Sequence, residues 1–171
     1  MTGAETVPSS NYVTGCLVCR DSSRTIEACL KSLKGVDFVS ITDTGSKDNT
    51  VDLIHRTLQH QNTPYKLTRF EWCDDFSAAR NFNLSHVPEE SGWIFWLDSD
   101  DVVEGTEHLK ELLETQPEDV GAVWLKYNYA QDEFGNICTM FYRERVLRSR
   151  YQWLWKSRLH ETIQPLTPCR Y

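Results

Sequence analysis

The sequence has no long hydrophobic stretch, and none of its apolar runs approaches the roughly 20 residues that a helix needs to cross a bilayer. The opening segment, MTGAETVPSSNY, also lacks the basic and apolar regions of a secretory signal peptide. These absences argue against a membrane span and against secretion. We therefore expect a cytoplasmic chain in which residues 1–12 form a flexible lead-in.

Basic residues are in the minority. The chain has 18 Lys and Arg against 25 Asp and Glu, which gives a formal net charge of −7. A general nucleic-acid binder needs a basic surface to neutralise phosphates. The charge balance therefore argues against a nucleic-acid partner.

The chain also lacks a complete cysteine-based metal motif. Cys16 and Cys19 form a CxxC, but no second CxxC or paired histidine follows at zinc-finger spacing. Both lie in the apolar run VTGCLVC, where a free cysteine behaves as a small buried hydrophobe. This pattern favours structural thiols over a zinc or redox site.

Strand-like and helix-like patterns alternate along the 171 residues, a length typical of one domain. Strands are expected at residues 13–19, 36–42, 65–71, 93–97, 120–130 and 137–147, with a last strand within 153–163. Helical spacing of apolar residues is expected at 26–33, 51–58, 76–86 and 107–115. The early alternation predicts a mostly parallel sheet with helices on both faces, and the later hairpin predicts an antiparallel addition.

The most informative stretch is WIFWLDSDD, residues 93–101. Its continuously apolar half predicts a strand buried on both faces. Asp98 and Asp100 follow at a spacing that puts both side chains on one face of an extended backbone. Such carboxylates suit Mg²⁺ or Mn²⁺. The alternative is a solvated acidic loop that caps the next helix.

Polar residues also follow the first two predicted strands, as Cys19-Arg20-Asp21 and as the run that starts at Asp43. Ligands of open α/β sheets bind beyond the carboxyl ends of the strands. We therefore expect these clusters and the aspartates after residue 97 to share one rim of the sheet.

Several segments together resemble glycosyltransferase family 2, which has the nucleotide-sugar-binding GT-A fold. They are CLVCRDSSRTIEACLKSLKGVDFVSITDTGSKDNTVDLI, DDFSAARNFNL, WIFWLDSDDVV and LHETI. The resemblance implies an α/β fold with a GT-A type, Rossmann-like mixed sheet, flanked by helices on both faces. It also implies one domain at 13–171, with a nucleotide-binding part at 13–101 and an acceptor-side part at 102–171.

The resemblance further implies an inverting transferase that uses a nucleotide diphosphate sugar, with UDP as the default, and Mn²⁺ or Mg²⁺. The implied donor-binding residues are Cys19, Arg20, Asp21, Asp43, Gly45, Ser46, Arg80, Asp98 and Ser99. The implied metal ligands are Asp98, Asp100 and His160. Glu161 is the candidate base for the acceptor hydroxyl and Asp101 is its rival.

Structural alternatives remain open for several of these residues. Asp43 also suits a turn before Gly45, and Arg80 also suits an ion pair on a helix surface. Tyr151, Trp153 and Trp155 suit either a sugar-binding wall or core packing.

The acceptor stays undetermined between a glycan, a lipid and a protein. The chain ends soon after LHETI, so we expect either a minimal transferase or one domain of a longer protein. A non-catalytic nucleotide-sugar-binding module is the main alternative function. A nucleotidyltransferase is disfavoured, because the first strand is not followed by a basic, glycine-rich phosphate loop.

Overall fold

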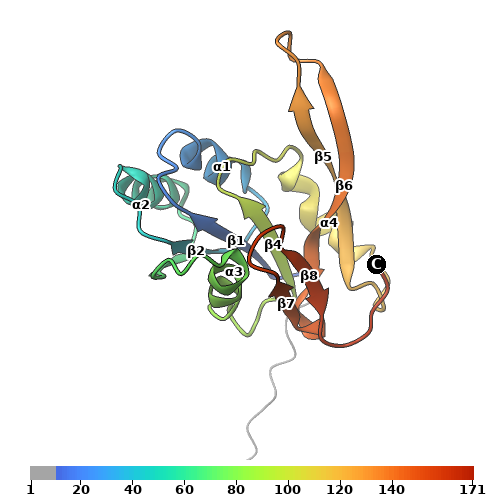
Figure 1. The fold of residues 1–171 in the computed structure, drawn as a ribbon. Helices are drawn as coiled ribbons and strands as arrows, with labels where there is room; N and C mark the ends of the chain where they lie inside the picture. Colours follow the sequence, from blue (N-terminus) through green and yellow to red (C-terminus); the bar gives the residue numbers. More distant parts are fainter. Residues whose placement is uncertain (1–10) are drawn as a thin grey trace, which may run out of the picture.

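The computed structural model describes residues 11–171, so the expected lead-in lies almost entirely outside the described residues. A six-stranded sheet runs through the molecule in the order β3-β2-β1-β4-β6-β5 (Figure 1). Its strands are β1 (Val13–Cys19), β2 (Phe38–Asp43), β3 (Tyr65–Arg69), β4 (Trp93–Asp98), β5 (Ala122–Gln131) and β6 (Ile137–Arg148). The first four are parallel and the last two antiparallel, which confirms the predicted mixed sheet.

Helices cover both faces of this sheet, also as predicted. Helices α1 (Ile26–Ser32), α2 (Thr50–Gln61) and α4 (Leu109–Glu114) bury their apolar sides against one face. Helix α3 (Phe76–Leu84) covers the other face together with a small second sheet of β7 (Trp153–Lys156) and β8 (Thr162–Pro165). Central strand β4 is therefore buried on both sides, which accounts for its uninterrupted apolar sequence.

Two local expectations need correction. The single strand expected within 153–163 is a pair, because a bend at residues 158–160 separates β7 from β8. The helix expected at 107–115 starts as a 3-10 turn, Thr106–His108, before α4 begins. Both differences lie at element boundaries, which local apolar spacing defines poorly.

The register aligns the strand ends that carry the polar clusters. Cys19 pairs with Asp43 across β1 and β2, and Val18 pairs with Asp98 across β1 and β4. The three loops that follow these strands therefore emerge at one rim. Strands β5 and β6 continue past the sheet as a projecting arm (Figure 1). Within residues 11–171, no helix combines the length and apolarity needed to cross a bilayer.

Candidate functional site

A cavity of about 490 Å³ opens at the rim where β1, β2 and β4 end. The polar residues of its lining include Arg80, Asp98, Ser99 and Asp100. The lining also contains two aromatic rings, those of Trp72 and Phe76, together with Cys19, Arg20 and Thr44. A second, more open hollow of about 610 Å³ adjoins it and shares Ser99 and Asp100. The predicted rim is thus a real concave site.

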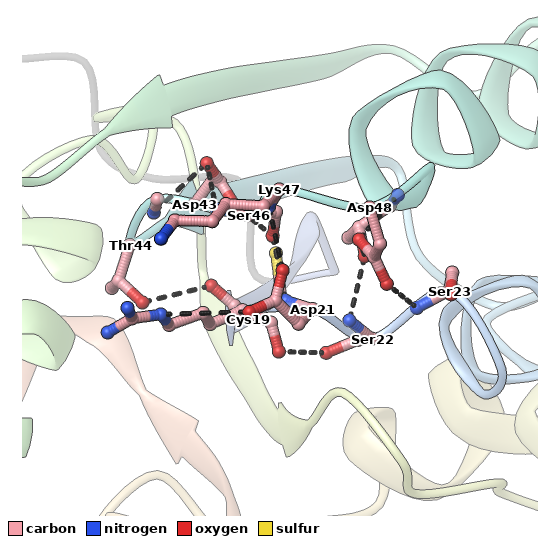
Figure 2. Close-up of polar contacts among 12 residues, drawn as sticks. Cys19, Asp21, Ser22, Ser23, Asp43, Thr44, Ser46, Lys47 and Asp48 are labelled. Atoms are coloured by element: carbon pink, nitrogen blue, oxygen red, sulfur yellow. Dashed lines mark hydrogen bonds and ion pairs between the residues drawn. The ribbon is translucent and has the colours of Figure 1, made fainter.

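The loops after β1 and β2 hold each other in place through backbone–side-chain hydrogen bonds (Figure 2). The Asp21 amide donates to Ser46 Oγ at 2.9 Å, and the Lys47 amide donates to Asp21 Oδ1 at 2.7 Å. The Ser23 amide donates to Asp48 Oδ2 at 3.0 Å. Asp21 has a φ of 47°, a strained conformation that these bonds help to maintain. The two loops therefore form one preorganised wall.

Asp43 is buried, and its carboxylate is engaged by its own turn (Figure 2). It accepts hydrogen bonds from the amides of Gly45 and Ser46 and from Ser46 Oγ. Gly45 has a φ of 104°, in the region that glycine adopts most readily. These contacts agree with the alternative of a turn-forming aspartate and leave direct recognition of a nucleotide by Asp43 as a prediction.

The three aspartates after β4 have three different environments. The Asp98 amide donates to Asp101 Oδ2 at 3.0 Å, which closes a tight turn. The carboxylates of Asp98 and Asp101 both contact Arg145, at 3.5 Å and 2.9 Å. Asp100 is exposed, and its side chain makes no hydrogen bond or ion pair within residues 11–171. Asp100 is therefore the free carboxylate of the loop, and it lines both hollows.

Arg80 connects this loop to the end of the chain. Its Nη2 contacts Asp98 Oδ1 at 2.6 Å, and its Nε donates to Glu161 Oε1 at 2.8 Å. The guanidinium carbon lies 5.2 Å from the ring centroid of Trp96 and 4.7 Å from that of Trp155. Because only 12% of its side chain is exposed, the alternative of an ion pair on the helix surface is wrong.

His160 does not join the acidic loop. No group of three or more His, Cys, Asp or Glu side chains that could hold a metal occurs in the described part of the chain. The predicted trio of Asp98, Asp100 and His160 is therefore not assembled. His160 is exposed and has a φ of 52°, at the turn before β8. Its neighbour Glu161 faces the interior and is 16% exposed.

A divalent ion still fits the donor groups at the rim, provided that substrate oxygens complete its shell. Mg²⁺ is commonly held by one or two carboxylates together with phosphate oxygens and water. Asp100 offers an unengaged carboxylate, and Asp98 is partly exposed beside it. The chain thus supplies part of a coordination shell and not a complete cage.

Burial and the neighbouring arginines shift the pKa values of the loop aspartates in opposite directions. Burial disfavours charged Asp98, but Arg80 and Arg145 outweigh it, so the pKa of Asp98 lies below its ordinary value. Burial raises the pKa of Asp101 even though Arg145 opposes the change. Burial also raises the pKa of Tyr127 to about 12, helped by the charge of Asp101 beside it. Asp98 is thus held as a carboxylate at neutral pH.

The cysteine and tryptophan predictions are resolved by packing. Cys16 and Cys19 are free and buried, and burial raises the pKa of the Cys19 thiol to about 12, which confirms structural thiols. Trp153 and Trp155 are core residues, with Trp155 perpendicular to Trp96 at 4.8 Å. A sugar-binding wall made of these tryptophans is therefore wrong.

Sequence reasoning missed four side chains of the site. Trp72 and Phe76 lie edge to face at 4.8 Å in the cavity wall. The two aromatic residues in WCDDF directly precede and begin the segment DDFSAARNFNL, and this proximity is the signal that could have indicated them. Arg145 and Tyr127 come from the projecting arm. Nothing in the sequence near either residue indicates a link to the aspartates.

Comparison with known proteins agrees with the mixed α/β fold described above. The family model described as Glycosyl transferase family 2 matches residues 16–167. The mannosyltransferase PcManGT from Pyrobaculum calidifontis, solved with GDP-Man and Mn²⁺, has a similar fold with a TM-score of 0.56 and 20% identity. That similarity covers 69% of this chain and 37% of the mannosyltransferase.

Two curated relatives match a shorter region. A TPR repeat-containing protein of Synechococcus elongatus is 35% identical over 106 residues, which are 60% of this chain and 24% of that protein. The SPbeta prophage-derived glycosyltransferase SunS of Bacillus subtilis is 32% identical over 102 residues, 58% of this chain and 22% of SunS. The chain therefore matches about a quarter of the length of these relatives. On the family match over most of its length, and on its mixed sheet, this chain belongs to glycosyltransferase family 2.

Proposed function

We propose that the chain binds a nucleotide diphosphate sugar in the 490 Å³ cavity and transfers the sugar, with inversion, to an acceptor hydroxyl. The observation that carries this proposal is that one cavity lining combines two aromatic rings with charged side chains. A nucleobase would pack on Trp72 and Phe76, and the diphosphate would lie toward Arg80 and Asp100. UDP rests on the family resemblance, and the GDP-Man complex of PcManGT makes a guanine donor the alternative.

Asp100, with Asp98 beside it, would hold Mn²⁺ or Mg²⁺. Such an ion stabilises the negative charge that develops on a diphosphate leaving group. Arg80 would add positive charge from the protein itself while it keeps Asp98 ionised. His160 is left out of this proposed shell because it does not gather with the aspartates.

Glu161 is the better placed of the two candidate bases. Asp101 accepts a hydrogen bond from the Asp98 backbone amide and forms an ion pair with the buried Arg145. These two contacts already fix the orientation of its carboxylate and neutralise its charge. The Glu161 carboxylate has one ion pair, through Oε1, and its residue lies in an irregular segment before β8. Its second oxygen is available for an acceptor hydroxyl.

The test is release of nucleoside diphosphate from UDP-glucose and GDP-mannose, each with MnCl₂, with MgCl₂ or with EDTA. Without an acceptor, this measures donor hydrolysis, and binding is measured by calorimetry on the same samples. We expect metal-dependent binding and release for one donor, and loss of both in Asp100→Asn. Asp119→Asn is the matched control, because Asp119 is a surface residue paired with Arg170.

Glu161→Gln separates a transferase from a binding module. A general base typically contributes roughly 10²–10⁴-fold, so release should fall by that factor while donor binding persists. Both candidate bases are engaged by arginine in this structure, which is the observation that favours the non-catalytic alternative. Binding without release in the wild-type chain would support that alternative, and absence of binding to either donor would refute the proposed function.

A further inference from the structure

Arg145 lies on β6 at a break in the regular pairing of the arm. Val123 pairs with Val146 and Trp124 pairs with Glu144, so Arg145 is the extra residue of a β-bulge. A bulge leaves one residue unpaired and redirects its side chain. On its other side, β6 pairs with β4 only as far as Val146 with Phe95, so Arg145 is the next residue along β6. The bulge therefore places this side chain beside the end of β4.

The guanidinium of Arg145 is enclosed by aromatic rings. Only 5% of the side chain is exposed, and its guanidinium carbon lies 4.0 Å from the ring centroid of Trp96 and 4.7 Å from that of Tyr127. Burying a charge is unfavourable unless it is paired. Its Nη1 is buried without a hydrogen-bond partner anywhere in residues 11–171. Compensation for its burial therefore comes chiefly from the carboxylates that contact Nη2.

Those carboxylates belong to the proposed donor site. Nη2 of Arg145 lies 2.9 Å from Asp101 Oδ2 and 3.5 Å from Asp98 Oδ2. Asp101 Oδ2 also accepts a hydrogen bond from the Asp98 amide. Two of the three loop carboxylates are thus drawn toward the arm, and Asp100 alone keeps an unengaged carboxylate at the cavity.

We infer that Arg145 is a positioning residue for the donor site. It holds the Asp98–Asp101 turn in the one arrangement that presents Asp100 to a metal-bound diphosphate. It does so without lining the cavity itself, through its contacts with the aspartates of the acidic loop. The inference rests on the proposed function, because it concerns the same donor.

The test compares Arg145→Gln and Arg145→Lys with Arg148→Gln and Arg148→Lys. Arg148 is a matched control: it is on the same strand and stacks on Trp93 at 4.1 Å, but its hydrogen bonds go to backbone carbonyls far from the aspartates. Binding of UDP and of GDP with MnCl₂ is measured by calorimetry at a temperature where each variant is folded. Outer partners of metal ligands typically contribute roughly 10–100-fold in metal affinity.

We expect Arg145→Gln to weaken Mn²⁺-dependent binding by about 10–100-fold. Arg145→Lys should restore part of this, because it keeps the charge but not the planar fork. The Arg148 variants should lose stability and bind normally. Should Arg145→Gln not fold, the comparison of Arg145→Lys with Arg148→Lys decides the question.

Hydrogen exchange supplies a readout that needs no ligand. The amide hydrogen of Asp98, which is donated to Asp101, should exchange faster in Arg145→Lys than in the wild-type chain. Its exchange rate should be unchanged in Arg148→Lys. Wild-type affinity in both Arg145 variants would overturn the inference while leaving the proposed function intact. Absence of nucleotide binding in the wild-type chain would instead overturn both.

Discussion

Replacement of Arg80 should reveal how firmly the end of the chain is attached to the donor site. Arg80→Met keeps the unbranched stem and removes the guanidinium that pairs with Asp98 and Glu161 and stacks on two tryptophans. Glu161 would then lose its cation, and Asp98 would keep only its 3.5 Å contact with Arg145. We expect the fold to survive with a reduced free energy of unfolding.

The magnitude follows from the exposure of the three side chains. Removing one partner of a fully buried ion pair costs about 3–5 kcal/mol, whereas an exposed pair contributes about 0–1 kcal/mol. Arg80 is 12% exposed and Glu161 16%, but Asp98 is 32% exposed, so solvent screens part of the effect. Loss of the cation–π contacts adds about 0.5–2 kcal/mol. We therefore expect a total loss of about 2–4 kcal/mol.

Urea unfolding followed by tryptophan fluorescence at pH 7 measures this loss. A double-mutant cycle with Glu161→Gln isolates the Arg80–Glu161 pair, for which we expect a coupling of about 1–2 kcal/mol. Arg56→Met is the control, since the Arg56 side chain is 70% exposed and lies 3.6 Å from Glu27, and it should change stability by less than about 0.5 kcal/mol. A loss of less than about 0.5 kcal/mol in Arg80→Met, or a coupling near zero, would refute this account.

Two further predictions concern the strand and the acidic loop. Trp96 is 2% exposed, so Trp96→Ala should lower the free energy of unfolding by about 3–5 kcal/mol. The control is Trp124→Ala, at a 44% exposed position on the arm, which should change the free energy of unfolding much less. Equal urea midpoints for the two variants would contradict a central position of β4. Acidification should destabilise the fold, because Asp98 keeps a depressed pKa despite the opposing effect of burial. Its contribution is complete above the unfolded pKa of about 3.9 and is lost as pH falls through the folded value. Asp101, with a raised pKa, acts in the opposite sense, and a free energy of unfolding that stays constant or rises from pH 7 to pH 3 would show that it dominates.

The sequence alone determined the order and type of the main elements and the rim at which the site lies. The spacing of apolar residues reports burial directly, so strands β1, β2 and β4 were predicted within a few residues. A parallel arrangement then places the ends of these strands together, whatever the details of packing. The family resemblance rested on the same local segments, and the family match agrees with it.

Only the tertiary structure decided which carboxylate of the loop is free. The local pattern groups Asp98 with Asp100 but does not show which of the three carboxylates is unengaged, because the residues that engage Asp98 and Asp101 come from distant elements. Arg145 lies 47 positions from Asp98, and a β-bulge sets its direction.

The sequence likewise did not indicate that Glu161 forms an ion pair with Arg80. Arg80 is 81 positions from Glu161 along the chain, and the two meet because α3 and the β7–β8 sheet pack on the same face. His160 is exposed, and the described residues contain no group of three or more potential ligands that would join it to the aspartates. Contacts of this kind join elements that are far apart in the chain, and local hydrophobic periodicity does not specify which of these elements pack together.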